Sequence, residues 1–276
     1  MRQLGERCHM VVGDARAGVR QPSQPILVLA KSRRVIDVVA ADPGGLTWRQ
    51  VQRATGLPVS TTVRLLQNLV AEGFLDVIAG RYLVGLGVLR WARSRRVESR
   101  LTLLAQPELD ALRDTTGETA VLFVRYGDQR VLVGIAETRH EVVRLVSIGQ
   151  VMPLHAGSAG KVFLAYEDEV RDRVLDFGEL TAYTPGTIVD AERLRAELVG
   201  IQACGWADSV AERDLGTASI SAPVHDHTGE LAAVLGIGVP EQRFTDANRP
   251  MWTEAVVTAA RRLSAAMGHA ERTAGG

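Results

Sequence analysis

Apolar residues in the first part of this chain repeat at helical spacing. From Ile26 they recur every three or four positions, and Asp42-Pro43-Gly44-Gly45 ends that run. Two shorter runs of helical period end at Gly56 and Gly73, and glycine adopts the left-handed conformation after a helix at little cost. The pattern predicts three helices, over 26–41, 48–55 and 60–72.

The second and third of these helices have the arrangement of a helix-turn-helix. Thr47-Trp48-Arg49-Gln50 is a capping box, and the helix that it begins is expected to bury Val51 and Ala54. Leu57-Pro58 then turns the chain into a helix whose outer face is rich in small polar and Arg residues. Segments 74–78 and 81–84, on either side of Ala79-Gly80, predict a two-stranded hairpin that would be the wing. A short helix with such an outer face fits the major groove of DNA.

Strands and helices alternate over the remaining two thirds of the chain. Short turns at 126–129 and 226–229 join consecutive strands, which predicts a mostly antiparallel sheet and an α+β domain. We expect an amphipathic helix at 101–112, strands at 120–126, 131–137, 142–147, 151–154, 206–210, 218–226 and 231–239, and helices at 158–176, 191–204 and 246–268.

Charge is distributed unevenly along a chain whose net charge is zero. Residues 1–100 hold 16 of the 32 Lys and Arg residues and 7 of the 32 Asp and Glu residues, whereas residues 101–276 hold 16 and 25. A basic first third indicates a polyanionic partner. No apolar run is long enough to cross a bilayer, no signal peptide is recognisable, and the two cysteines are far apart. We therefore expect a cytoplasmic protein without membrane contact, cofactor, disulfide or metal site.

Several motifs together resemble the IclR family of bacterial transcriptional regulators. The resemblance covers roughly residues 30–265 and is carried by Ala54-Thr55-Gly56-Leu57-Pro58, Leu69-Val70-Ala71-Glu72-Gly73-Phe74-Leu75, Arg81-Tyr82-Leu83-Val84-Gly85, Pro153-Leu154-His155-Ala156-Gly157-Ser158-Ala159-Gly160-Lys161 and Cys204-Gly205-Trp206-Ala207-Asp208. Val59 and Val63 depart from the family, in which Lys and His are common at these two positions.

The resemblance implies a winged helix-turn-helix domain followed by a GAF-like, mixed α/β effector-binding domain with a mostly antiparallel sheet. The domains expected are a flexible N-terminal arm at 1–25, the DNA-binding domain at 26–86, a linker helix at 87–100 and the effector-binding domain at 101–270. The expected function is ligand-responsive regulation of transcription, either repression or activation, without enzymatic activity. The partners would be double-stranded operator DNA of near-palindromic sequence, a small-molecule effector, and further copies of the chain in a homodimer or tetramer.

Candidate DNA contacts lie on the second and third helices and beside the wing. Arg64 and Gln67 are expected to read bases, and the remaining candidates to contact phosphates or base edges. The whole set is Arg49, Gln50, Arg53, Ser60, Thr61, Thr62, Arg64, Gln67 and Arg81. An alternative use of the same domain is docking of another protein.

Candidate effector contacts lie where the strand at 151–154 gives way to the next helix. Small residues there allow a ligand close to the backbone, and the free N–H groups of a helix start favour an anion. The candidates from this turn are Leu154, Ala156, Gly157, Ser158, Ala159 and Gly160, and the resemblance adds Ser209, Glu212, Ser219, Ser221, Gly236 and Gly238. The effector would be a small acid or an aromatic molecule. The small residues could instead serve only to pack the helix on the sheet.

The same turn also resembles the nucleophile elbow of a serine hydrolase. Ser158 would be the nucleophile, with His225 or His227 and Asp190 or Asp208 completing a triad. This alternative requires a mostly parallel sheet and leaves the basic first third without a role. A phosphate-binding loop is excluded, because only two residues separate Gly157 from Gly160 and Val162 replaces the metal-binding hydroxyl residue.

Overall fold

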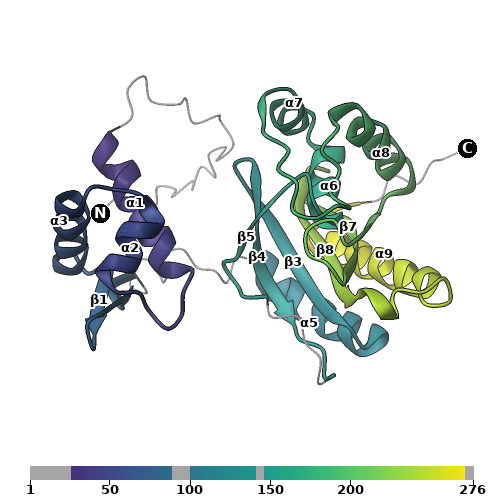
Figure 1. Ribbon diagram of the computed structural model, residues 1–276. Helices are drawn as coiled ribbons and strands as arrows, with labels where there is room; N and C mark the ends of the chain where they lie inside the picture. Colours follow the sequence, from purple (N-terminus) through teal and green to yellow (C-terminus); the bar gives the residue numbers. More distant parts are fainter. Residues whose placement is uncertain (1–25, 89–99, 141–145, 271–276) are drawn as a thin grey trace, which may run out of the picture. The chain divides into compact units, whose positions relative to one another are not determined.

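The computed structural model describes residues 26–88, 100–140 and 146–270. The chain divides near residue 95 into two compact units, which are described separately below (Figure 1). The N-terminal arm expected at 1–25 lies outside the described residues, as does most of the linker helix expected at 87–100.

The first unit consists of three helices followed by a hairpin. The elements are α1 (Leu27–Ala40), α2 (Trp48–Thr55), α3 (Val59–Ala71), β1 (Leu75–Ile78) and β2 (Arg81–Val84). The two strands are antiparallel, and Ala79-Gly80 forms the turn between them. Side chains from all three helices and from β1 form one buried core, which includes Val35, Val51, Leu66 and Leu75. The elements agree with those expected from the sequence to within a residue or two.

The face that α2 buries differs from the expected one by one residue. Ala54 is exposed, and Thr55 is buried in its place. Thr55 tolerates this position because its hydroxyl donates to the Val51 carbonyl at 2.8 Å, so no polar group is left without a partner. At the start of the helix, the Gln50 Oε1 accepts a hydrogen bond from the Thr47 N–H at 2.9 Å, as a capping box requires.

The second unit is built on one six-stranded sheet in which every neighbouring pair is antiparallel, in the order β5-β4-β3-β8-β7-β6 (Figure 1). Its strands are β3 (Thr119–Tyr126), β4 (Gln129–Ala136), β5 (Val151–Pro153), β6 (Ala207–Val210), β7 (Thr217–His225) and β8 (Leu231–Pro240). Its helices are α5 (Arg100–Thr116), α6 (Ser158–Tyr166), α7 (Asp168–Phe177), α8 (Ala191–Cys204) and α9 (Arg249–Ala266), with a short 3₁₀ helix η1 (Glu241–Arg243).

Helices cover both faces of this sheet and enclose two cores. Ala120 and Leu122 of β3 pack with α5 and α9 on one face. Val121 and Phe123 of the same strand pack with α6, α7 and α8 on the other. This alternation follows from the period of two in a strand. The α+β class and the mostly antiparallel sheet expected from the sequence are therefore confirmed.

Two elements of the second unit differ from the expectation. The helix expected at 158–176 is two helices, because the chain leaves helical geometry at Glu167, where φ is −122° and ψ is 89°. The strand expected at 142–147 lies mostly outside the described residues, and residues 146 and 147 are not in a strand. Among the described helices, none has both the length and the apolar character needed to cross a membrane.

Candidate DNA-binding surface and effector pocket

The outward face of α3 carries the residues expected to contact DNA, with one exception. Ser60, Arg64 and Gln67 are exposed and Thr61 is partly exposed. Thr62 is fully buried, and its hydroxyl donates to the Pro58 carbonyl at 3.1 Å. Because its side chain is 0% exposed, Thr62 is not available on this surface, and the bond to the carbonyl four residues earlier satisfies its buried hydroxyl.

The other candidates of the first unit are exposed, and two of them already have partners. Arg49 and Arg53 are exposed on α2, and Gln50 beside them caps that helix. Arg81, at the start of β2, donates from Nη1 to the Gly45 carbonyl at 2.8 Å. This contact ties the wing to the α1–α2 turn and holds the guanidinium in place.

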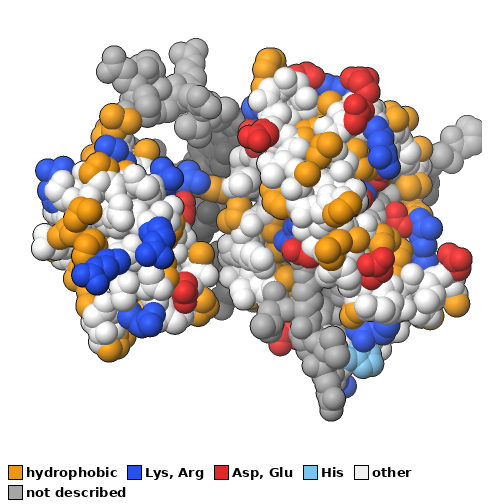
Figure 2. Space-filling model, viewed as in Figure 1, with side chains coloured by type: hydrophobic (Ala, Val, Ile, Leu, Met, Phe, Trp, Pro, Cys, Tyr) orange, Lys and Arg blue, Asp and Glu red, His pale blue; other side chains and the backbone are white. Residues whose placement is uncertain are grey.

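The described part of the first unit is mildly basic. Residues 26–88 contain seven Lys and Arg residues against four Asp and Glu residues, a net charge of +3. Lys and Arg side chains are spread over the face of this unit that Figure 2 shows, and acidic ones are few there. The surface thus has the sign of charge that a phosphate backbone attracts.

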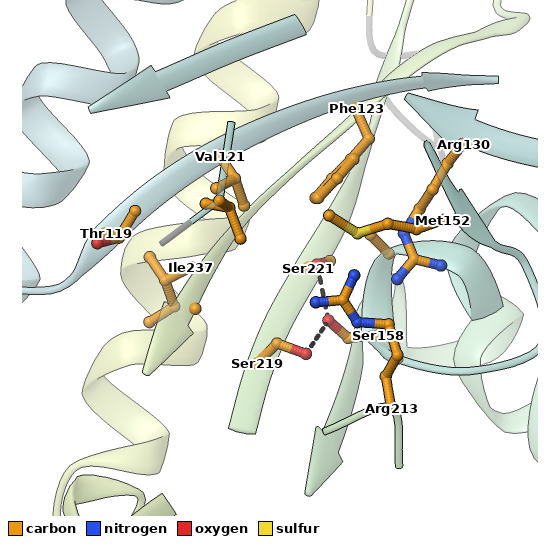
Figure 3. A pocket seen from close by; sticks show the side chains of 14 residues that line it. Thr119, Val121, Phe123, Arg130, Met152, Ser158, Arg213, Ser219, Ser221 and Ile237 are labelled. Carbon is orange, nitrogen blue, oxygen red and sulfur yellow. Dashed lines mark hydrogen bonds between the residues drawn. The ribbon is translucent and has the colours of Figure 1, made fainter. Parts of the chain in front are cut away.

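A pocket in the second unit lies between the sheet and the start of α6 (Figure 3). Its space is about 60 Å³. This exceeds the roughly 10–15 Å³ that a single water molecule needs, so the pocket admits water or a small organic molecule. Its lining is Thr119, Val121, Phe123, Arg130, Val146, Met152, Gly157, Ser158, Ala159, Arg213, Ser219, Ser221, Ile237 and Gly238.

Three serine hydroxyls meet at the base of this pocket. Ser158 Oγ is 2.7 Å from Ser219 Oγ and 2.8 Å from Ser221 Oγ, and Figure 3 shows the three side chains pointing toward one another. Ser158 comes from the first turn of α6, whereas Ser219 and Ser221 alternate along β7 and so face the same side of the sheet. A ligand with hydrogen-bonding groups can exchange partners with these hydroxyls, because each can rotate to donate or accept.

Two arginines bring positive charge to the same pocket. Arg130, on β4, is buried and donates from Nη2 to the Ala156 carbonyl at 3.0 Å and from Nη1 to the Pro153 carbonyl. Arg213 precedes β7 and pairs with Asp214 at 2.8 Å. Figure 3 shows both guanidinium groups beside the serine cluster. Each guanidinium is permanently charged and presents only donors, so both side chains favour an anionic ligand in this pocket.

An ion-pair network lies behind the pocket and holds the start of α6. Glu212 Oε2 accepts from the Gly157 N–H at 2.9 Å, and Glu212 Oε1 pairs with Lys161 Nζ at 2.6 Å. Lys161, which is 1% exposed, also pairs with Glu197. Gly157 has φ +91°, a conformation that favours glycine at this position. Glu212 is thus paired within the protein and does not line the pocket.

The pocket contains half of the candidate effector contacts. Gly157, Ser158, Ala159, Ser219, Ser221 and Gly238 line it, whereas Leu154, Ala156, Gly160, Ser209, Glu212 and Gly236 do not. Gly160 and Gly236 instead make room for their neighbours. A Cβ on Gly160 would lie 2.1 Å from the Leu154 carbonyl oxygen, and one on Gly236 would lie 2.4 Å from Ser221 Oγ. The alternative that small residues of the turn serve only close packing is therefore favoured at Gly160, and packing also requires the glycine at 236.

Sequence reasoning missed both arginines of the pocket. Arg130 lies in a strand between Gln129 and Val131. The alternation of side chains in a strand was the one local signal that could have indicated that Arg130 points inward. Arg213 lies outside the regular elements, and no pattern in the sequence marks which way it points. The apolar lining residues, such as Phe123 and Met152, have no sequence feature that distinguishes them from other buried apolar residues.

The hydrolase alternative finds no support in this geometry. Ser158 has serine hydroxyls as its side-chain hydrogen-bond partners, and its sheet is antiparallel, whereas a nucleophile elbow belongs to a mostly parallel sheet. Within the described residues, no group of three or more His, Cys, Asp or Glu side chains is arranged to hold a metal ion.

Comparison with known proteins agrees with both halves of the structure. Residues 28–77 match the IclR helix-turn-helix domain, and residues 97–265 match the C-terminal domain of bacterial IclR transcriptional regulators. The chain is 32% identical over 250 residues to the HTH-type transcriptional regulator BhcR of Paracoccus denitrificans, covering 90% of this chain and 89% of that protein.

Solved structures extend this likeness. An IclR transcriptional regulator from Alicyclobacillus acidocaldarius superposes with a TM-score of 0.74 at 26% identity, covering 89% of this chain and all of that one. An IclR homologue from Microbacterium hydrocarbonoxydans, solved with 4-hydroxybenzoate, has a TM-score of 0.72 at 25% identity and covers 87% of this chain and 98% of that one.

These findings define a ligand-responsive, DNA-binding regulator of transcription rather than an enzyme. The chain belongs to the IclR family. Membership implies two kinds of partner, DNA and a small-molecule effector.

Proposed function

We propose that this regulator binds a near-palindromic, double-stranded operator through the outward face of α3. The observation that carries this proposal is the row of exposed side chains Ser60, Arg64 and Gln67 on one face of that helix. Arg can hold a guanine through two hydrogen bonds, and Gln can hold an adenine in the same way. Arg49 and Arg53 of α2 and Arg81 of the wing would then contact phosphates.

The effector that best fits the pocket is a small carboxylic acid. Arg130 and Arg213 would neutralise the carboxylate, and Ser158, Ser219 and Ser221 would bind its oxygens or a neighbouring polar group. The first turn of α6 adds N–H groups and the positive end of a helix dipole. An acid bound to the Microbacterium homologue supports this class of ligand. The space of about 60 Å³ favours a molecule of a few heavy atoms.

Effector binding would change operator affinity through the whole assembly. A coupling free energy of about 1–3 kcal/mol corresponds to a change in affinity of about 5- to 150-fold. The coupling requires that the acid bind one state of the protein better than the other, because equal affinity for both would shift nothing.

A near-palindromic operator requires a symmetric dimer, or a tetramer built from two dimers. The first unit offers an apolar groove between α1 and α3 that supports such an assembly. Its lining includes Val28, Leu29, Ile36, Leu65 and Phe74, and Ile26 and Leu27 are exposed at its end. A second copy of the chain would cover the apolar side chains that α1 contributes, and Arg64, which also lines the groove, would stay outside that contact and face the DNA.

Replacing Arg64 by alanine is expected to weaken operator binding by about 5- to 150-fold, the range typical of losing a contact to a guanine. Fluorescence anisotropy with a labelled duplex, selected from a random library by the wild-type protein, measures the change. The wild-type affinity should fall with salt, with a log–log slope of about −0.9 for each phosphate neutralised. Arg173→Ala, on α7 of the second unit, is the matched control and should bind normally. Absence of DNA binding by the wild type at 50 mM salt would instead support a winged helix that docks another protein.

Replacing Arg213 by glutamine is expected to weaken binding of a small carboxylate by about tenfold or more, because a charge-assisted hydrogen bond is lost. Isothermal titration of the full chain with a series of acids, from acetate and pyruvate to 4-hydroxybenzoate, identifies the ligand and measures the loss. Arg173→Gln, in an exposed pair with Asp128 on another part of the unit, serves as control. Equal affinities of the Arg213 variant and the wild type for the best acid would remove Arg213 from the site.

A further inference from the structure

The start of α3 carries an exposed apolar side chain among polar ones. Val59 is the first residue of the helix and is 53% exposed, whereas Ser60 and Thr61 follow it with polar side chains. Val63 lies one turn later on the same side of the helix and is partly exposed. Single exposed apolar residues are common on protein surfaces, so exposure alone assigns no role. The place of Val59 on the helix is what distinguishes it.

Val59 is separate from the apolar groove proposed for self-association. That groove is lined by residues of α1 and by the side of α3 that carries Arg64, Asn68 and Glu72, and Val59 is not part of it. The core of the unit also leaves Val59 out, although Leu65, Leu66 and Leu69 of the same helix belong to it. Within the described residues, the side chain therefore faces a surface other than the core or the groove.

The major groove presents one apolar group, the C5 methyl of thymine. In a helix-turn-helix, the residues at the N-terminal end of the recognition helix approach the base edges. An isopropyl group has neither donor nor acceptor, so it cannot read the polar edges of guanine, adenine or cytosine. A contact between the two apolar groups removes both from water and stabilises the complex without any directed bond.

We propose that Val59 reads the methyl group of a thymine in each operator half-site. This inference rests on the proposed binding of DNA through α3 and adds a base preference to it. Val59 selects thymine by burial of its methyl group, whereas Arg64 and Gln67 select bases by hydrogen bonds. The contact adds no charge, so it does not change the salt dependence of binding.

The test removes the methyl group from the DNA rather than from the protein. In a duplex selected from a random library by the wild-type protein, each thymine of the half-site is replaced in turn by deoxyuridine, which pairs as thymine does and lacks only the methyl. At one position the wild type should lose about three- to fivefold in affinity, the value expected for one buried methyl. Val59→Ala should bind the unmodified duplex with a similar loss and should show no further loss with deoxyuridine at that position.

Two more variants make the outcome specific. Val59→Thr keeps one γ-methyl group and should retain part of the sensitivity to deoxyuridine. Val199→Ala, which changes a valine that is 69% exposed on α8 of the other unit, should behave as the wild type with every duplex.

The inference fails if no deoxyuridine lowers the affinity of the wild type, or if Val59→Ala keeps the same sensitivity. In either case the proposed function stands as long as Arg64→Ala still weakens binding. Loss of all operator binding in the wild type would instead overturn the proposed function, and this inference with it.

Discussion

Lys161→Met is expected to lower the free energy of unfolding of the second unit by about 3–5 kcal/mol, the cost of removing one partner from a buried ion pair. The lysine side chain is 1% exposed, and its ammonium group lies 2.6 Å from Glu212, which is itself nearly buried. Methionine fills a similar volume but leaves this carboxylate without a cation. Urea denaturation of the full chain, followed by far-ultraviolet circular dichroism and by tryptophan fluorescence, to which the buried Trp252 contributes, measures the change.

A second substitution separates the ion pair from simple packing. Glu212→Gln in the Lys161→Met background removes the more deeply buried of the two carboxylates that lose their cation, and Glu197 is 35% exposed to solvent. The double variant should therefore recover a large part of the lost stability. The amide oxygen of glutamine accepts a weaker hydrogen bond from the Gly157 N–H than the Glu212 carboxylate does. Recovery of stability should therefore be incomplete. A loss below about 1 kcal/mol in the single variant would be in the range of an exposed pair and would contradict the buried network.

Gly160→Ala is expected to destabilise the second unit by about 3 kcal/mol, at the upper end of the usual cost of overpacking. The added Cβ would lie 2.1 Å from the Leu154 carbonyl oxygen and 2.5 Å from Arg130 Nη1, and backbone atoms cannot move aside as a side-chain end can. Because Arg130 would be displaced from the Pro153 and Ala156 carbonyls, affinity for a carboxylate effector should fall as well.

Gly200→Ala provides the matched comparison, since both glycines lie inside helices of the same unit. No atom is found within 4 Å of a Cβ built on Gly200. Alanine there should raise stability by about 0.5–1 kcal/mol, because it reduces the freedom of the unfolded chain and favours the helix. If the two variants have the same unfolding midpoint in urea, the close approach of α6 to Leu154 is not a feature of the folded protein.

The order of elements could be predicted from the sequence because local signals agree with one another. Gly56 ends α2 with φ +64°, Gly205 ends α8 with φ +80°, and the Ala79-Gly80 turn joins the strands of the wing. Each of these residues has a local conformational reason for its place. Where the signal was ambiguous the expectation failed, as with Ala54 and Thr55, since a threonine can be buried once a carbonyl accepts its hydroxyl.

The pocket was only partly predictable, because its residues come from strands that are distant in sequence. The turn at 156–160 was recognisable from its small residues, whereas Ser219 and Ser221 were candidates only through the resemblance to the IclR family. Arg130 became part of the site only through the pairing of β4 with β5, which brings it beside the Pro153 and Ala156 carbonyls. Glu212 was expected to face the ligand, but it pairs with Lys161. No local feature of the sequence indicates that the Lys161 side chain is buried.

Gly238 has a consequence for how such a regulator changes its response during evolution. It lies on β8 in the pocket lining, and a Cβ built there meets no atom within 4 Å. Larger side chains can therefore enter at this position without disturbing the sheet, and each would narrow the space left for a metabolite. The serine cluster and both arginines could stay as they are while the size of the accepted molecule drifts. Substitution at this one position would then change which ligands fit the pocket. The fold and the contacts to the carboxylate would stay the same.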